Sequence, residues 1–173
     1  MKHILLTIVC VAIVLVTTAD AEAKEWRGIV PLRSTRTEVE KILGSPATDP
    51  LTGSCRCLYQ SEEIIVHVFY ASDHPCDENQ DGKAKGWRVP ADTVVEIVVS
   101  FRKDQPLSDF KIDEKYEKEV DKHVPGLTYY TNRDEGVRIE AGKFTVSSVS
   151  YFPAAKDKHL RCRKKLDKAV CSL

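Results

Sequence analysis

Residues 63–70 read Glu-Ile-Ile-Val-His-Val-Phe-Tyr, a run that is apolar at nearly every position. In an extended chain, alternate side chains point to opposite faces, so this segment presents apolar side chains on both sides. A strand of that kind is typical of the middle of a sheet, where both faces are covered. We therefore expect residues 63–70 to form a central strand around which the rest of the chain is organised.

Strand patterns extend outward from this run in both directions. They comprise Arg56–Gln60, Thr93–Phe101, Leu127–Thr131, Val137–Ala141 and Thr145–Phe152. Together with the central run they form two sets of three, each preceded by a short polar stretch that is compatible with a helix. The sequence thus predicts an α+β fold, with an antiparallel sheet, short helices on one face and two pseudo-repeated helix-plus-three-strand units.

Local signals mark the first helix clearly and the second one less so. Thr35 followed by Glu38 is a capping box, in which each residue satisfies a backbone donor at the helix start. Gly44 then provides a left-handed residue that ends the helix. Alternating Glu and Lys within Tyr116–His123 suggest a short second helix.

The N-terminus predicts export. Ile4–Val16 is an apolar run of thirteen residues, too short for a membrane span of about 20 but suited to a signal peptide. Small residues in residues 19–23 then fit cleavage after Ala21 or Ala23. We expect a signal peptide over 1–21, a first α+β unit over 24–103, a second over 104–155, and a basic C-terminal tail over 156–173. The exported chain contains no second apolar run, so we expect no transmembrane segment and a secreted or periplasmic location.

The charge balance argues against a nucleic-acid partner. The chain has 26 basic and 26 acidic residues and a formal net charge of +0. A neutral protein has no global positive field to attract phosphates. The basic tail could still contact anionic envelope polymers, although a solvated chain end accounts for it equally well.

Cysteine content agrees with export, because thiols in an oxidising compartment are usually paired. Five cysteines remain beyond the signal peptide: Cys55, Cys57, Cys76, Cys162 and Cys171. We expect Cys76 to pair with Cys57 (or Cys55), which would tie the loop after the central strand to the first strand. Cys162 with Cys171 is the second expected pair.

A possible calcium loop lies in the longest polar insertion. Asp77, Asn79 and Asp81, followed by Gly82, match the start of a calcium-binding loop, in which alternate oxygens surround a hard cation. The twelfth position is Arg88, where an EF-hand needs a bidentate Glu. A full EF-hand is therefore excluded, and the alternatives are a weaker Ca²⁺ site completed by a distant carboxylate or a solvated acidic loop.

Other chemistry has less support. Cys55 and Cys57 together with His74 and Cys76 have the ligand types of a zinc site, but export favours oxidised cysteines. The nucleophile-elbow motif G-x-S-x-G and the zinc-hydrolase motif H-E-x-x-H do not occur. We therefore expect a protein that is not an enzyme and assign no catalytic residues; a small secreted hydrolase is the remote alternative.

Three stretches carry a resemblance to known families. Residues 31–46, PLRSTRTEVEKILGSP, resemble the opening of the BamE/SmpA lipoprotein family, and the doubled unit is similar to the β-lactamase inhibitory protein group. Residues 26–32 and 87–90 also resemble a family of uncharacterised secreted bacterial proteins. The likeness implies helices on one face of a small antiparallel sheet and a tendency to bind protein. It transfers no site residues, and the chain lacks the lipobox cysteine of the lipoproteins.

These observations favour an exported protein-binding module, inhibitor-like or involved in envelope assembly, with an unknown protein partner. Exposed side chains on the wet sheet faces would form the contact surface, with Tyr129, Tyr130 and Tyr151 as aromatic candidates. A calcium-binding module using residues 77–82 is the first alternative.

Overall fold

The computed structural model describes residues 23–47, 55–73, 76 and 86–162. Its main feature is a seven-stranded, entirely antiparallel sheet with strand order β1-β2-β3-β7-β6-β5-β4. The strands are β1 Arg56–Gln60, β2 Ile64–Tyr70, β3 Val94–Pro106, β4 Glu117–Val120, β5 Thr128–Asn132, β6 Val137–Ala141 and β7 Thr145–Tyr151. The helices are α1 Arg36–Leu43 and two 3₁₀ helices, η1 Leu107–Asp109 and η2 Ala155–Leu160.

The predicted α+β class with two pseudo-repeated helix-plus-three-strand units is wrong. The described chain is largely β, with α1 as its only helix of seven residues or more. The six predicted strands all form, within a few residues of their expected bounds. The error lies in the helices, because the only helix between the two strand sets among the described residues is the three-residue 3₁₀ helix η1.

Residues 117–120, where the second helix was expected, form the edge strand β4. They pair antiparallel with β5 from Glu117↔Thr131 to Val120↔Thr128, and all four side chains are exposed. Alternating charges suit a solvated helix and a solvated edge strand alike, and charged side chains also discourage pairing with a further chain. Pairing with β5, the next strand along the chain, decides between the two structures.

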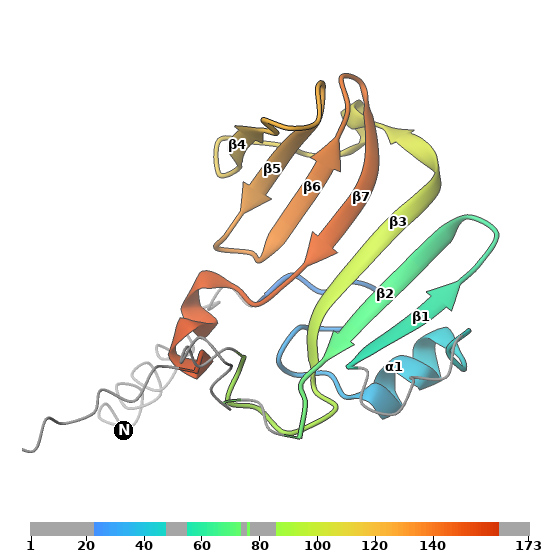
Figure 1. Cartoon of the computed structure of the whole chain (residues 1–173), viewed down its shortest axis with the longest axis vertical. Coiled ribbons are helices and arrows are strands. Elements are labelled where there is room, and N and C mark those ends of the chain that lie inside the picture. The colour runs from blue at the N-terminus through green and yellow to red at the C-terminus, as the bar shows by residue number, and fades with distance from the viewer. Residues whose placement is uncertain (1–22, 48–54, 74–75, 77–85, 163–173) are drawn as a thin grey trace, which may run out of the picture.

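The two strand sets join through their third members. β3 and β7 run side by side in the middle of the sheet, with Val99 opposite Val149 (Figure 1). β3 is 13 residues long and crosses the expected unit boundary at 103/104, so the two halves share one continuous strand. The predicted central run 63–70 is β2, which is paired on both edges as its two apolar faces indicated.

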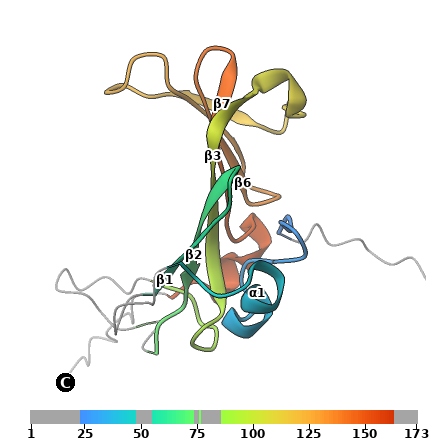
Figure 2. The same ribbon diagram turned by 90° about the vertical axis from the view of Figure 1, so that its right-hand side faces the viewer.

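One face of the sheet is covered by the segments between the strands. Figure 2 shows α1, the preceding N-terminal segment and η2 on the same side of the sheet, with the 107–116 segment further up. The other face carries no helix among the described residues.

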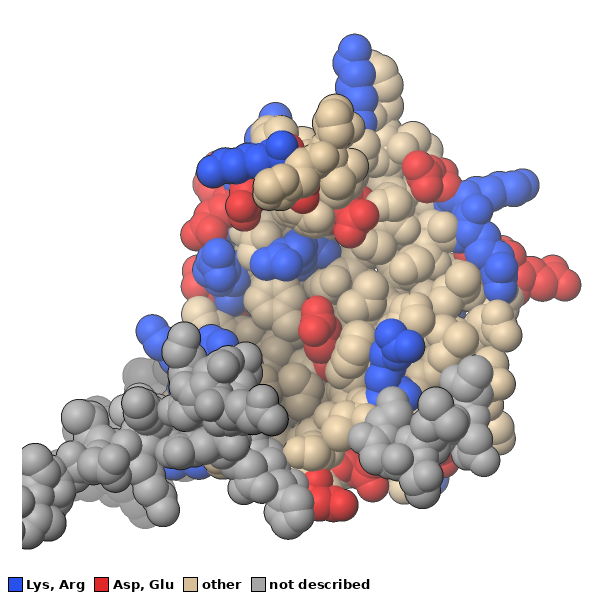
Figure 3. Space-filling model, viewed as in Figure 1, with Lys and Arg blue, Asp and Glu red and all other residues tan. Residues whose placement is uncertain are grey.

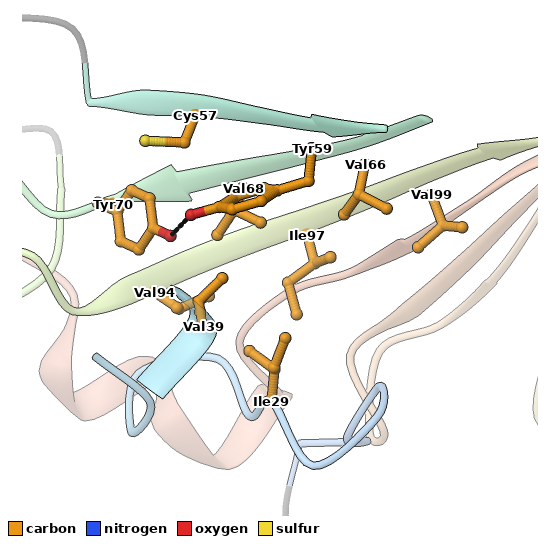
Figure 4. Close-up of a cluster of buried hydrophobic side chains, with 10 residues drawn as sticks. All are labelled: Ile29, Val39, Cys57, Tyr59, Val66, Val68, Tyr70, Val94, Ile97 and Val99. Atoms are coloured by element: carbon orange, nitrogen blue, oxygen red, sulfur yellow. Dashed lines mark hydrogen bonds between the residues drawn. The ribbon is translucent and has the colours of Figure 1, made fainter. Parts of the chain in front are cut away.

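Two apolar clusters form beneath these covering segments. Cluster 1 joins β1, β2 and β3 to α1 and to Ile29, with all its side chains on the covered side of the sheet (Figure 4). Cluster 2 comprises Val137, Ile139, Ala141, Val146 and Val149, against which Phe110, Ile112 and Tyr116 pack. Phe101 and Tyr151 contact both clusters and connect them.

The first helix begins and ends where its sequence signals predicted. Glu38 Oε2 accepts a hydrogen bond from the Thr35 backbone N–H at 2.7 Å, and the Glu38 N–H donates to Thr35 Oγ1, which completes the capping box. Gly44 follows with a φ of 81°, in the left-handed region that glycine tolerates. Val39 is fully buried against the sheet.

A disulfide and η2 hold the last described residues to the sheet. Cys76 is bonded to Cys162, across a sequence separation of 86 residues, and Arg161 bridges to Trp87. The expected pairings of Cys76 with Cys57 (or Cys55) and of Cys162 with Cys171 are therefore wrong. Residues 156–162 of the predicted tail belong to the fold, whereas 163–173 lie outside the described residues.

Candidate functional site: an apolar groove on the covered face

A cleft opens on the covered face between the N-terminal segment, which contains Trp26, and the 107–116 segment, which contains Phe110. Neither apolar cluster is fully covered there. The cleft encloses about 710 Å³ and its floor is the middle of the sheet, at the seam between β3 and β7. The apolar lining residues are Trp26, Ile64, Val99, Phe101, Phe110, Val149 and Tyr151. Volumes of 300–1,000 Å³ with mainly apolar and aromatic linings are typical of binding sites.

Two further hollows adjoin this cleft and share lining residues with it. One of about 570 Å³ shares Phe110 with it and is also lined by Tyr130 and Phe144. A smaller one of about 120 Å³ shares Arg27 and Ile64 and reaches Ile42 on α1. We call the three together the apolar groove, which crosses the covered face from α1 to the β6–β7 turn.

A tight turn places Trp26 and Arg27 at the groove. Trp26 and Ile29 exchange backbone hydrogen bonds at 2.9 Å in both directions, with Arg27 and Gly28 between them at φ values of 53° and 79°. Positive φ at both central residues is the geometry of a type I′ turn. The Arg27 guanidinium lies 5.0 Å from the Trp26 ring centroid, a cation–π contact that fixes both side chains.

Phe101 and Phe110 form the aromatic centre of the groove. Their ring centroids are 6.1 Å apart with an interplanar angle of 63°, an edge-to-face arrangement. Phe101 extends from β3, whereas Phe110 follows η1 and is brought back over the sheet by the Leu107 N–H bond to the Phe144 carbonyl. The groove therefore depends on contacts between distant parts of the chain.

Charged side chains of both signs surround the mouth of the main cleft. They are Arg27, Arg102, Lys103, Glu62 and Glu63. None of the five forms an ion pair with another described residue. Arg102 instead donates to the Ser61 carbonyl at 2.9 Å and to Gln60 Oε1 at 3.2 Å, which ties the β1–β2 turn to β3. The cleft lining contains no Ser, Cys or His side chain.

The opposite, open face of the sheet has a different character. Charged groups gather along its upper edge and sides, with isolated charges over a mainly uncharged centre (Figure 3). Arg138 on β6 is exposed there, with its guanidinium 5.8 Å from the Tyr129 ring centroid and 6.0 Å from that of Phe152. Its Nε donates to Thr131 Oγ1 at 3.3 Å.

Two titratable groups on the open face are shifted by burial. Burial raises the pKa of the Glu96 carboxyl, and the Arg138 charge opposes that rise. Burial also lowers the pKa of His67 on β2, assisted by the positive charge of Arg56. His67 Nδ1 is buried and has no hydrogen-bond partner among the described residues. These two groups lie on the face away from the groove, since their strand neighbours Val68 and Ile97 point into cluster 1.

The predicted calcium ligands Asp77, Asn79 and Asp81 lie outside the described residues, as does His74. Within the described ranges, no three His, Cys, Asp or Glu side chains come together in a way that could hold a metal ion. The zinc alternative also required Cys76, which the disulfide with Cys162 occupies. Cys55 and Cys57 are both unbonded, with Cys57 buried.

The three candidate tyrosines separate onto two faces. Tyr151 and Tyr130 line the groove, on the covered side of the sheet. Tyr129 lies on the open face, where its hydroxyl donates to Asp121 Oδ2 at 3.3 Å. Sequence reasoning did not identify Trp26 and Phe110 as groove residues. The available signal was the presence of apolar side chains at irregular spacing outside the strands, in segments that cover the sheet.

Comparison with known proteins gave no match: no protein-family model, curated protein or solved structure is significantly similar to the chain. None of the helices among the described residues has the length and apolar character needed to cross a membrane.

Proposed function

We propose that this protein is a non-enzymatic binding module whose apolar groove receives apolar side chains of a protein partner. The observation that carries the proposal is an aromatic-lined cleft of about 710 Å³ beside a second hollow of about 570 Å³, with Phe110 lining both. Aromatic residues and arginine are enriched in the energetically important parts of protein interfaces.

Strand pairing in the sheet restricts how a partner can bind in the groove. The groove floor consists of strands that are paired on both edges, so their backbone groups are already used and cannot bond an added strand. Recognition must therefore occur through side chains. We propose that the partner presents an amphipathic helix or loop, with apolar residues entering the groove and charged residues of both signs facing the mixed rim.

Two exposed apolar side chains favour a protein partner over a small ligand. Phe144 is 71% exposed and Ile42 is 46% exposed, and they border opposite ends of the groove. Exposed apolar side chains that flank a groove extend the contact beyond the main cleft, as a protein partner would need.

We also propose that the protein acts in a secreted or periplasmic setting, which residues 1–21 support through their signal-peptide pattern. The Cys76–Cys162 disulfide is compatible with such an oxidising environment.

A position-specific cross-linking experiment tests the proposal. A photoreactive residue replaces Lys103 at the groove mouth, and a control replaces Glu119, an exposed residue of β4 that does not line the groove. We expect one partner to be captured from position 103 and not from position 119, and excess unlabelled protein to prevent its capture. Equal capture from both positions would contradict docking in the groove.

The captured partner is then purified and its affinity measured by titration calorimetry. Phe144→Asp places a charge at the groove and should weaken binding about thirtyfold, as loss of a hot-spot contact of about 2 kcal/mol does. Val124→Asp is the matched control, because Val124 is 50% exposed and lines none of the three hollows. Equal losses in the two variants would show that the partner binds elsewhere.

A further inference from the structure

We propose that Cys55 and Cys57 form a redox-active pair, in which Cys55 exchanges with a small-molecule disulfide and Cys57 closes an intrachain bond. Neither cysteine lines the apolar groove. Cys76 is bonded to Cys162, and the two cysteines at the start of β1 keep their thiols.

The backbone places the two thiols on one side of the sheet. The Tyr70 N–H donates to the Cys55 carbonyl at 2.6 Å, which continues the β1–β2 ladder by one residue beyond Arg56↔Phe69. Residues two apart on a strand share a face and lie about 6.6 Å apart at two rises of about 3.3 Å. That separation is near the upper end of the Cα spacing of disulfides, about 6.8 Å. Cys55 precedes β1, so closing the bond requires adjustment at the end of the strand and not within it.

The two cysteines differ in access, which gives them separate roles. Cys57 is 0% exposed and points into cluster 1 beside Tyr70 (Figure 4), so an external disulfide cannot reach it. Cys55 is partly exposed and is the thiol that meets the incoming disulfide.

Arg36 supplies the charge that the buried thiol needs. Its Nη1 donates to Cys57 Sγ at 2.7 Å, and its position is fixed by the ion pair with Asp92 at 2.8 Å. The guanidinium also stacks on the Tyr70 ring at 4.2 Å. A cation held against the sulfur stabilises the negative charge that the sulfur carries as an attacking thiolate.

With oxidised glutathione as the co-reactant, the exchange has two steps. The Cys55 thiolate attacks one sulfur of glutathione disulfide; that S–S bond breaks, a mixed disulfide forms and one glutathione thiolate leaves. The Cys57 thiolate then attacks Cys55 Sγ, forms the Cys55–Cys57 bond and releases the second glutathione. Two electrons pass from the protein to glutathione, and the two thiol protons are taken up by the departing thiolates.

The test equilibrates the purified protein in glutathione buffers, quenches with acid, alkylates free thiols and maps tryptic peptides by mass spectrometry. Arg56 lies between the cysteines, so trypsin separates their peptides when both are reduced, and the disulfide keeps them joined. Cys57 and Cys76 share the tryptic peptide 57–83, so fragmentation of the joined peptide identifies which of the two is bonded to Cys55. We expect joined peptides in oxidised glutathione and separate alkylated peptides in reduced glutathione. A Cys55–Cys171 link, or full alkylation of both thiols in oxidised glutathione, would overturn the proposal.

Single variants test the two roles. Cys57→Ala should accumulate glutathione on Cys55, and Cys55→Ala should accumulate about tenfold less on Cys57, because that thiol is inaccessible. Circular dichroism establishes that both variants are folded. Equal adduct formation on both would refute the division of roles.

Arg36→Gln should slow closure of the mixed disulfide about tenfold, as expected when a hydrogen bond to a charged group is lost. Arg133→Gln is the matched control, because Arg133 is also an ion-paired arginine, bonded to Glu117 and not to a cysteine. An unchanged closure rate in Arg36→Gln would remove Arg36 from the proposal.

Discussion

At the scale of single residues, Gly136 shows how closely the turn after β5 is fitted to the end of β7. Gly136 has a φ of 66°, and its carbonyl accepts a hydrogen bond from the Phe152 N–H at 2.8 Å. A Cβ at this position would lie 1.9 Å from the Phe152 carbonyl oxygen. Both the positive φ and the lack of room for a Cβ therefore require glycine at position 136.

Gly136→Ala should therefore destabilise the protein by about 4 kcal/mol or more, because the clash is with backbone and cannot relax cheaply. Gly126→Ala is the matched control: Gly126 has a φ of 84°, but a Cβ there meets no atom within 4 Å. Its cost should be about 1–2 kcal/mol, for the left-handed conformation alone. Urea unfolding monitored by circular dichroism measures both, and equal losses would show that the close approach to Phe152 is absent.

At the scale of elements, the capping box of α1 connects helix stability to pH. Hydrogen bonds from the Thr35 backbone N–H and then its hydroxyl hold the pKa of Glu38 below its ordinary value of 4.5. Folding thus favours the ionised carboxylate. The resulting stabilisation is fully present above about pH 4.5 and is lost as the pH falls through the lower folded-state pKa.

Glu38→Gln should consequently lose less stability than the wild type between about pH 6 and pH 3. Glu40→Gln, on the same helix but outside the capping box, should keep the wild-type dependence. The measurement is the urea midpoint at each pH. Parallel curves for wild type and Glu38→Gln would contradict the linkage.

At the scale of the whole molecule, the two halves of the sheet share a seam and the aromatic side chains that connect their apolar clusters. β3 and β7 pair along the seam, and Phe101 and Tyr151 contact both apolar clusters. Neither half can lose its packing without exposing apolar surface in the other. We therefore expect one unfolding transition in the protein, coincident by tryptophan fluorescence and by circular dichroism.

Phe101→Ala should lower the free energy of unfolding by about 2 kcal/mol, since it removes the contacts of a partly buried ring with both clusters. Phe144→Ala makes the same chemical change at a side chain that is 71% exposed, and should cost at most about 0.5 kcal/mol. Two separate transitions in either the wild type or Phe101→Ala would show that the halves unfold independently.

Strand positions and the first helix follow from local sequence. The alternation of apolar and polar residues and the apolar runs located β1, β2, β3, β5, β6 and β7. Thr35, Glu38 and Gly44 located α1. Both kinds of signal act over only a few residues. The groove was only partly foreseen: Tyr130 and Tyr151 were named as contact candidates, whereas Trp26 and Phe110 were not. Those two lie in irregular segments whose position depends on the sheet that they cover.

Three features arise only in the folded chain: the edge strand β4 in place of a helix, the pairing of Cys76 with Cys162, and the β3–β7 seam beneath the groove. The disulfide and the seam join residues far apart in sequence, and the β4–β5 pairing joins two consecutive strands across the turn between them. A local pattern specifies which side chains face together along one segment, but the free energy of burying them depends on which distant segment covers them.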